Sequence, residues 1–166
     1  MKKYLTIKNF LALLLTPYVI WLISSYDYHF IDNANFLFHE AGHIILGFFG
    51  QTIHFLGGTI LQLAIPAFIV VYFLREMKIF DAAVCGIWLG ESLMYTAVYI
   101  GDAKIMSLDL AGGGIHDFNW LFTRWGLLDK AESMGSTLHI IASVIVIASL
   151  IIVWKSAHKK GKLNSE

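Results

Sequence analysis

Hydrophobic stretches without charged residues divide the chain into segments that are long enough to cross a lipid bilayer. The longest, 41–74, contains no Asp, Glu, Lys or Arg, and two others cover 9–26 and 133–154. A fourth stretch, 82–101, is interrupted only by Glu91. About 20 apolar residues in a helix cross the hydrocarbon core of a membrane. The pattern therefore predicts helices over 9–26, 34–50, 59–75, 79–101 and 134–154.

The connections between these helices are short, with one exception. The pair Gly57-Gly58 predicts a break over 51–58, in the form of a turn or a short hairpin. The exception is the polar insert 102–133, which contains a shorter apolar piece, 118–128. The predicted fold class is all-α. We expect a polytopic transmembrane helical bundle of about four or five membrane helices, plus a re-entrant or short interfacial segment.

The composition agrees with a membrane protein and excludes several other classes. Hydrophobic residues make up 57% of the chain and charged residues 14%, whereas soluble domains are usually about one quarter charged. The formal net charge is zero, which argues against nucleic-acid binding. Cys85 is the only cysteine and excludes a disulfide framework. No repeat or linker divides the chain, so we expect a single integral-membrane domain, 1–166.

Basic residues predict the orientation of the helices. Nine of the twelve gather before the first predicted helix (Lys2, Lys3, Lys8), between the third and fourth (Arg75, Lys78), and after the last (Lys155, Lys159, Lys160, Lys162). Only Lys104, Arg124 and Lys130 lie in the insert 102–133. Cytoplasmic loops carry an excess of such residues. All three groups can be cytoplasmic only if 34–75 makes one net crossing, with one of its helices re-entrant or partial. We expect a bacterial plasma-membrane protein with cytoplasmic termini and an uncleaved signal anchor.

One predicted helix contains the pentapeptide His39-Glu40-Ala41-Gly42-His43, an H-E-x-x-H motif. Residues four apart lie on one face of a helix, so both imidazoles can bind one metal ion. Glu40 is then placed to act as the general base on water that zinc has activated. Ionisable groups inside a membrane segment are costly and usually mark function. The motif therefore predicts zinc as cofactor, with Ala41 and Gly42 permitting close approach of another backbone or a substrate.

A membrane-embedded H-E-x-x-H helix followed by further spans resembles the site-2-protease class of intramembrane zinc metalloproteases. The resemblance implies that His39 and His43 bind zinc and that Glu40 is catalytic. It also implies an endopeptidase that cleaves membrane or membrane-adjacent polypeptides by metal-activated water, with the lipid bilayer as its surroundings. That family supplies its third ligand as an Asp followed by Gly. No Asp in this chain is followed by Gly, so the third ligand has to be sought among local candidates.

The strongest candidates for the third ligand follow a run of glycines in the insert. His116 and Asp117 come directly after Gly112-Gly113-Gly114-Ile115, which can take an unusual backbone path. His116 would complete a familiar zinc set of three histidines. Asp117 could bind the metal, orient a histidine ligand, or cap the short helix that follows. Two further candidates are Asp102, at the end of the fourth predicted helix, and Asp109.

A second function remains open at this point. The same histidines suit a non-hydrolytic metal- or haem-binding membrane protein, with His39 or His43 paired with His116 or His139. Glu40 discriminates between the two, because hydrolysis requires it and haem binding does not. Gly86 and Gly90 form a G-x-x-x-G pattern, which permits close helix packing within the chain or between the copies of a homo-oligomer.

Overall fold

In the computed structural model, which describes residues 7–109 and 114–158, the chain is an all-α membrane protein. Within those residues the six α-helices are α1 (Ile7–Ser25), α2 (Phe30–Leu46), α3 (Gln51–Arg75), α4 (Ile79–Asp102), α5 (Asp117–Trp125) and α6 (Ala131–His158). Short 3-10 turns cover Gly47–Phe49 and Leu128–Lys130. Four segments of the described chain are long and apolar enough to cross a membrane: α1, α3, α4 and Leu128–His158.

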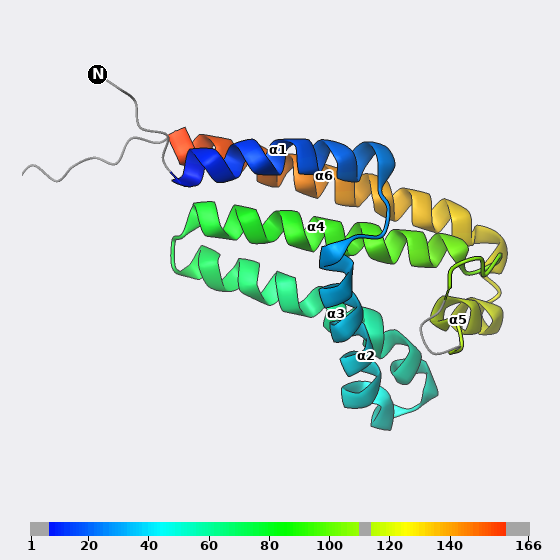
Figure 1. Ribbon diagram of the computed structural model, residues 1–166. Coiled ribbons are helices and arrows are strands. Elements are labelled where there is room, and N and C mark those ends of the chain that lie inside the picture. Colours follow the sequence, from blue (N-terminus) through cyan, green and yellow to red (C-terminus); the bar gives the residue numbers. More distant parts are fainter. Residues whose placement is uncertain (1–6, 110–113, 159–166) are drawn as a thin grey trace, which may run out of the picture.

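The membrane-spanning helices pack side by side, and α2 crosses them at a steep angle (Figure 1). Trp154 of α6 donates a hydrogen bond to the Thr16 hydroxyl of α1 at 3.0 Å, which ties these two helices together. The most extensive packing joins α4 to α6. At 17 residues, α2 is shorter than the membrane-spanning helices, and the nine-residue α5 lies beyond the end of α4.

The α4–α6 contact uses the predicted G-x-x-x-G face. A β-carbon at Gly86 would lie 2.5 Å from Ser149 Oγ, and one at Gly90 would lie 2.4 Å from Val146 Cγ1. Both glycines therefore let α6 of the same chain approach α4 closely. The close helix packing that the pattern predicts is therefore found within the chain.

Four of the seven basic residues that the structure describes lie at one end of the bundle, and the other three, Lys104, Arg124 and Lys130, lie around α5 at the opposite end. The start of α1, the turn between α3 and α4 and the end of α6 all lie at the left of Figure 1, and α5 lies at the right. The Lys8 ammonium of α1 sits 5.0 Å from the ring centroid of Phe80, near the start of α4. This is the arrangement in which residues 34–75 cross the bundle once, net. Lys2, Lys3, Lys159, Lys160 and Lys162 lie outside the described residues, as do Gly112 and Gly113.

The predicted break over 51–58 is wrong, because α3 begins at Gln51 and runs through both glycines. Glycine inside a helix costs about 1 kcal/mol relative to alanine, so a packing reason is expected. A β-carbon at Gly57 would lie 2.7 Å from the Gly42 carbonyl oxygen, and one at Gly42 only 2.1 Å from that of Gly57. These glycines bring the backbones of α2 and α3 together, as expected for Gly42.

Candidate metal centre

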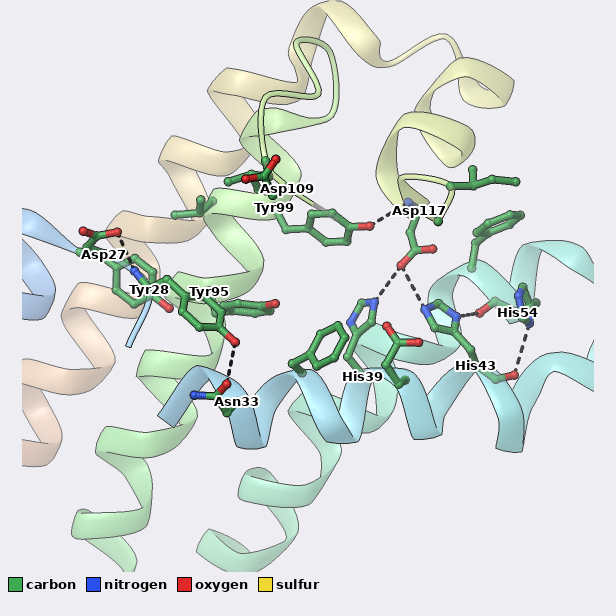
Figure 2. Close-up of a pocket in the computed structure, with 18 residues that line it drawn as sticks. Asp27, Tyr28, Asn33, His39, His43, His54, Tyr95, Tyr99, Asp109 and Asp117 are labelled. Carbon is green, nitrogen blue, oxygen red and sulfur yellow. Dashed lines mark hydrogen bonds and ion pairs between the residues drawn. The ribbon is translucent and has the colours of Figure 1, made fainter. Parts of the chain in front are cut away.

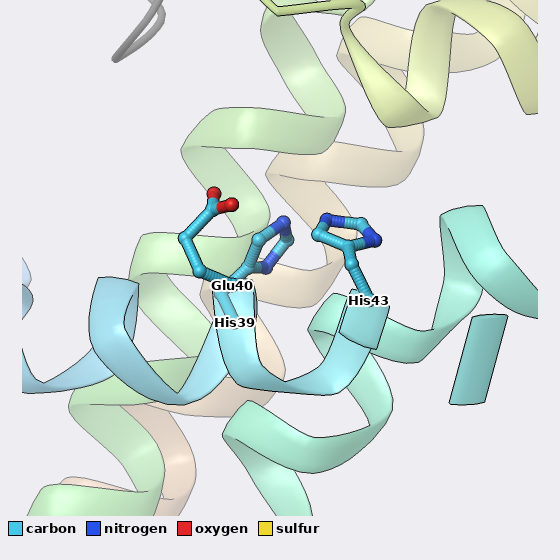
Figure 3. Close-up of side chains that lie close together, drawn as sticks. All are labelled: His39, Glu40 and His43. Atoms are coloured by element: carbon cyan, nitrogen blue, oxygen red, sulfur yellow. The ribbon is translucent and has the colours of Figure 1, made fainter. Parts of the chain in front are cut away.

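The two histidines of the H-E-x-x-H motif project from the same side of α2 (Figure 3). Their ring centroids are 4.8 Å apart. The Glu40 carboxylate lies beside them, and one ligand atom from each of the three side chains falls within 4.8 Å of the others. His39 is buried, whereas Glu40 is exposed towards a cavity. The helical spacing therefore produces the local geometry that the motif predicts.

Asp117, from the first turn of α5, meets both imidazoles (Figure 2). Its Oδ2 lies 2.8 Å from Nε2 of His39 and 3.2 Å from Nε2 of His43. The side chain is almost fully buried, with 4% of the residue exposed. Asp117 does not cap α5, because the N-cap residue is His116, whose Nδ1 accepts a hydrogen bond from the backbone N–H of Asn119. Its carboxylate is directed to the histidine pair instead.

The surroundings of His39 determine which of its nitrogens carries hydrogen. Nδ1 lies 3.1 Å from Oε1 of the buried Gln62. The Gln62 amide nitrogen donates to the backbone carbonyl of Ser92 at 3.2 Å, and a carbonyl only accepts, so the amide orientation is set. Oε1 must therefore accept from His39 Nδ1–H. In the neutral imidazole this leaves Nε2 with a lone pair directed at Asp117.

His43 is held in the same way by a different partner. Its Nδ1 lies 2.7 Å from the backbone carbonyl of His54, so Nδ1 again carries the hydrogen. Two Nε2 lone pairs and one carboxylate oxygen therefore converge, and only a proton or a metal cation relieves their repulsion. Two imidazole nitrogens and a carboxylate oxygen form a donor set that zinc takes in hydrolytic enzymes. The residues present fit such an ion.

The ionisation of Asp117 and His43 also favours a positive charge between the carboxylate and the imidazoles. Burial opposes ionisation of Asp117, but the contacts to His39 and His43 outweigh it and lower the pKa of the carboxyl below its usual value. The contact with Asp117 raises the pKa of His43 above its usual value, although burial works against this change. Asp117 is therefore an anion, and positive charge is stabilised between it and the imidazoles.

The other candidate ligands lie apart from the histidine pair. The His116 ring stacks on Tyr99, with centroids 4.2 Å apart, and its Nε2 faces Asp102 at 3.5 Å. Burial lowers the pKa of His116, partly offset by the nearby Asp102 and Asp117 carboxylates. Asp109 lines the cavity, and His139 borders a separate depression between α4 and α6.

Asp102 organises the loop that leads to Asp117. It accepts hydrogen bonds from the backbone N–H of Ser107 at 2.8 Å and of Leu108 at 3.1 Å, and from the Ser107 hydroxyl at 2.6 Å. The same carboxylate faces His116, which precedes Asp117. Asp102 thus links the end of α4 to both ends of the loop, which is a positioning role.

Tyr99 connects α4 directly to the cluster. Its hydroxyl accepts a hydrogen bond from the backbone N–H of Asp117 at 3.0 Å, and its ring lies edge-on to His39 at 5.7 Å. Glu91, Tyr95, Tyr99 and Asp102 fall near one stripe of α4 in the sequence. Through Tyr99 and Asp102, this stripe positions Asp117 against the motif.

Gln62 and the His54 carbonyl are the site components that sequence patterns did not reveal. Gln62 had a usable signal, because it is a polar side chain within the apolar run 41–74 and needs a buried partner. The His54 carbonyl had none, since its role depends only on how α3 lies against α2. Both partners orient a histidine, as the groups around metal ligands usually do.

The cluster opens into a cavity of about 910 Å³. His39, Glu40, His43 and Asp117 all line it, and the rest of its wall comes largely from aromatic and aliphatic side chains. A cavity of this size and character can hold a segment of another molecule against the cluster.

A second group of buried titratable side chains lies at the start of α2. Asp32 and Glu91 are completely buried, and His29 lies beside them. Asp32 Oδ2 is 2.8 Å from the backbone nitrogen of His29 and 2.7 Å from its Nδ1, and Oδ1 accepts from the Tyr26 hydroxyl at 2.5 Å. The Asn35 amide donates to both Glu91 oxygens, at 3.0 and 2.9 Å.

No family model, curated protein or solved structure matches this chain. The function therefore has to be argued from the chemistry of the cluster and its cavity.

Proposed function

We propose that this chain is a membrane-embedded zinc-dependent hydrolase, and specifically an endopeptidase that cleaves membrane or membrane-adjacent polypeptides. The observation that carries the proposal is the convergence of His39 Nε2, His43 Nε2 and Asp117 Oδ2 on one point, with Glu40 on the wall of the same cavity. The three atoms are acceptors when both imidazoles are neutral, and one zinc ion would satisfy all of them.

The proposed ligands are His39, His43 and Asp117. Zinc held by such a set lowers the pKa of water to about 7 and polarises a carbonyl group. Gln62 and the His54 carbonyl hold the two imidazoles in the tautomer that presents Nε2. Tyr99 and Asp102 hold the Asp117 segment against them.

Glu40 is the proposed general base. Its carboxylate takes a proton from the attacking water and passes it to the amine that leaves when the peptide bond breaks. The side chain suits this role because it is exposed to the cavity and lies beside the imidazoles without being needed to hold them.

The resemblance to site-2 proteases supports the same function. There too the third ligand is an aspartate on a later segment, and Asp117 is of that residue type, although Phe118 follows it in place of glycine. The haem-binding alternative requires His39 or His43 to pair with His116 or His139. His116 faces Asp102, and His139 borders a different depression, so the geometry favours hydrolysis.

We further propose that the basic end of the bundle faces the cytoplasm of a bacterial cell. Lys8, Arg75, Lys78 and Lys155 support this orientation through the excess of basic residues in cytoplasmic loops. The insert 102–133, with α5 and Asp117, would then lie towards the opposite side of the plasma membrane.

The test combines metal analysis with cleavage by the purified protein in detergent. We expect about one zinc per chain and chelator-sensitive cleavage of membrane-peptide substrates. Glu40→Gln should keep the zinc and lower the cleavage rate by at least about a hundredfold, the usual contribution of a general base. Glu76→Gln, a matched change at an exposed site in the α3–α4 turn, should leave both unchanged. Wild-type protein without stoichiometric zinc would overturn the proposal.

A further inference from the structure

The charged groups on the wall of the cavity all have the same sign. The lining includes Asp27, Glu40, Asp109 and Asp117, and no Lys or Arg of the described chain contributes to it. Glu40 and Asp117 belong to the proposed catalytic centre. Asp27 and Asp109 do not, and neither forms an ion pair with a Lys or Arg within residues 7–109 and 114–158.

Asp27 lies at the end of the cavity away from His43, next to aromatic rings (Figure 2). Tyr28 and Tyr95 have ring centroids 6.2 Å apart, and the Tyr28 hydroxyl donates to Asn33 Oδ1 at 3.1 Å. The Asp27 carboxylate accepts the backbone N–H of Tyr28 at 2.8 Å. Aromatic faces and carboxylates together bind organic cations, and the apolar stem of Lys or Arg packs well on such rings.

From this arrangement we propose that the cavity selects polypeptides with a Lys or Arg side chain about three residues from the bond that is cut. The proposal rests on the proposed function, because it assigns a substrate class to the same site. Tyr28, the neighbour of Asp27, contacts Asn33, which precedes His39 by six positions on α2, so this end of the cavity lies about 9 Å along the helix from the histidine at 1.5 Å per residue. An extended substrate covers that distance in about three residues at about 3.3 Å each.

The same features select against acidic segments. A Glu or Asp at that position would lie near Asp27, and Asp109 on the wall of the same cavity adds to the negative charge, so the like charges repel. A neutral residue at that position would be neither attracted nor repelled by the carboxylates. The expected order of preference is therefore Lys or Arg first, then Gln, then Glu.

Binding to the zinc-loaded Glu40→Gln protein tests this preference without requiring cleavage. The probes are fluorescein-labelled peptides of one Ala-, Leu- and Phe-containing sequence that differ at a single position, which carries Lys, Gln or Glu. We expect the Lys peptide to bind about tenfold more tightly than the Gln peptide, and the Glu peptide more weakly than both. Cleavage of the same peptides by wild-type protein then locates the Lys relative to the cut.

A variant without the charges of Asp27 and Asp109 tests whether these two residues cause the preference for Lys. Adding Asp27→Asn and Asp109→Asn to the Glu40→Gln protein should bring the ratio of Lys-peptide to Gln-peptide affinity close to one. Adding Glu76→Gln and Asp81→Asn instead removes two charges at exposed sites near the α3–α4 turn, and it should leave the ratio unchanged.

The outcomes separate this inference from the proposed function. Equal affinity for the three peptides, with cleavage intact, overturns the charge preference and leaves the hydrolase standing. A Lys preference that disappears in the Asp27 and Asp109 variant, with no cleavage by wild-type protein, supports the preference and overturns hydrolysis. A Lys preference that persists in that variant overturns the assignment to these aspartates.

Discussion

Two clusters of histidine and carboxylate side chains, one at the start of α2 and one at its H-E-x-x-H motif, differ in how their donors and acceptors are matched. Around Asp32 and Glu91, every carboxylate oxygen faces an N–H or O–H donor, supplied by Tyr26, His29 and Asn35. Around Asp117, the donors of His39 and His43 are already used by other acceptors. With both imidazoles neutral, two ring nitrogens without hydrogen therefore face a carboxylate oxygen at the Asp117 cluster, whereas His29 lies beside Asp32 with a ring nitrogen free to donate.

The difference indicates which of the two buried clusters is the better candidate for a metal site. Both clusters are buried, and both contain the residue types that bind metals. The carboxylates at the start of α2 accept from donors of their own cluster, whereas the Asp117 cluster takes up either a proton or a metal cation between the imidazoles and the carboxylate. Zinc is expected at the Asp117 cluster alone.

The largest expected difference between the clusters is in metal content. Asp117→Ala should abolish zinc binding, because one of three ligands is lost. Asp32→Ala should keep the zinc but lower the thermal stability, because the donors of His29 and Tyr26 lose their acceptor at a cost of about 1–3 kcal/mol. Metal analysis of the purified, folded proteins measures the difference. A folded Asp32→Ala protein without zinc would show that the two clusters do not act independently.

Replacing the residues that orient each cluster should also have different effects on zinc affinity. Gln62→Leu removes the acceptor that holds His39 Nδ1–H and should weaken zinc binding by about 10–100-fold. Asn35→Leu removes the donor to Glu91 and should lower the melting temperature while leaving zinc affinity intact. Competition with a chelator measures the affinity. Equal zinc affinity in the two variants would contradict the role of Gln62.

At the proposed metal cluster, His39 also packs closely against a glycine. A β-carbon at Gly58 would lie 2.6 Å from His39 Nε2, so Gly58→Ala must displace the ring. Overpacking of this kind costs about 1–3 kcal/mol and should also weaken zinc binding. Gly101→Ala is the matched control, because a β-carbon there meets no atom within 4 Å. Unchanged melting temperature and zinc affinity in Gly58→Ala would show that His39 can shift without consequence.

The smallest effect is expected at His116, next to the proposed ligand. His116→Ala removes the N-cap of α5, a loss of about 1 kcal/mol, and should retain zinc. Thermal unfolding together with metal analysis checks both parts. Loss of zinc from a folded His116→Ala protein would make His116 a ligand and would contradict the assignment to Asp117.

The helices were largely predictable from the sequence, because long apolar runs have few alternatives in a membrane. The predicted helix 79–101 corresponds closely to α4, and 134–154 lies within α6. The break over 51–58 was wrong, since glycine marks either a turn or a close approach, and only the position of α2 distinguishes the two. Helix α2 also begins earlier than predicted, at Phe30, where the Asp32 carboxylate accepts the His29 N–H.

The candidate site was predictable where its residues are neighbours in the sequence. His39, Glu40 and His43 share a helix, and the period of a helix places them together regardless of the rest of the fold. Sequence patterns left His116, Asp117, Asp102 and Asp109 as candidates for the third ligand. Spacing could not choose among them, because 78 positions separate His39 from Asp117.

The sequence by itself therefore determined an all-α membrane protein with an H-E-x-x-H helix, since hydrophobic length and helical period are local properties. The tertiary structure decided which carboxylate meets the imidazoles, which nitrogens face it, and that Gln62 and the His54 carbonyl hold them there. Those contacts depend on the docking of α3 and α5 against α2. Docking results from the packing of many distant side chains, which no local pattern in the sequence records.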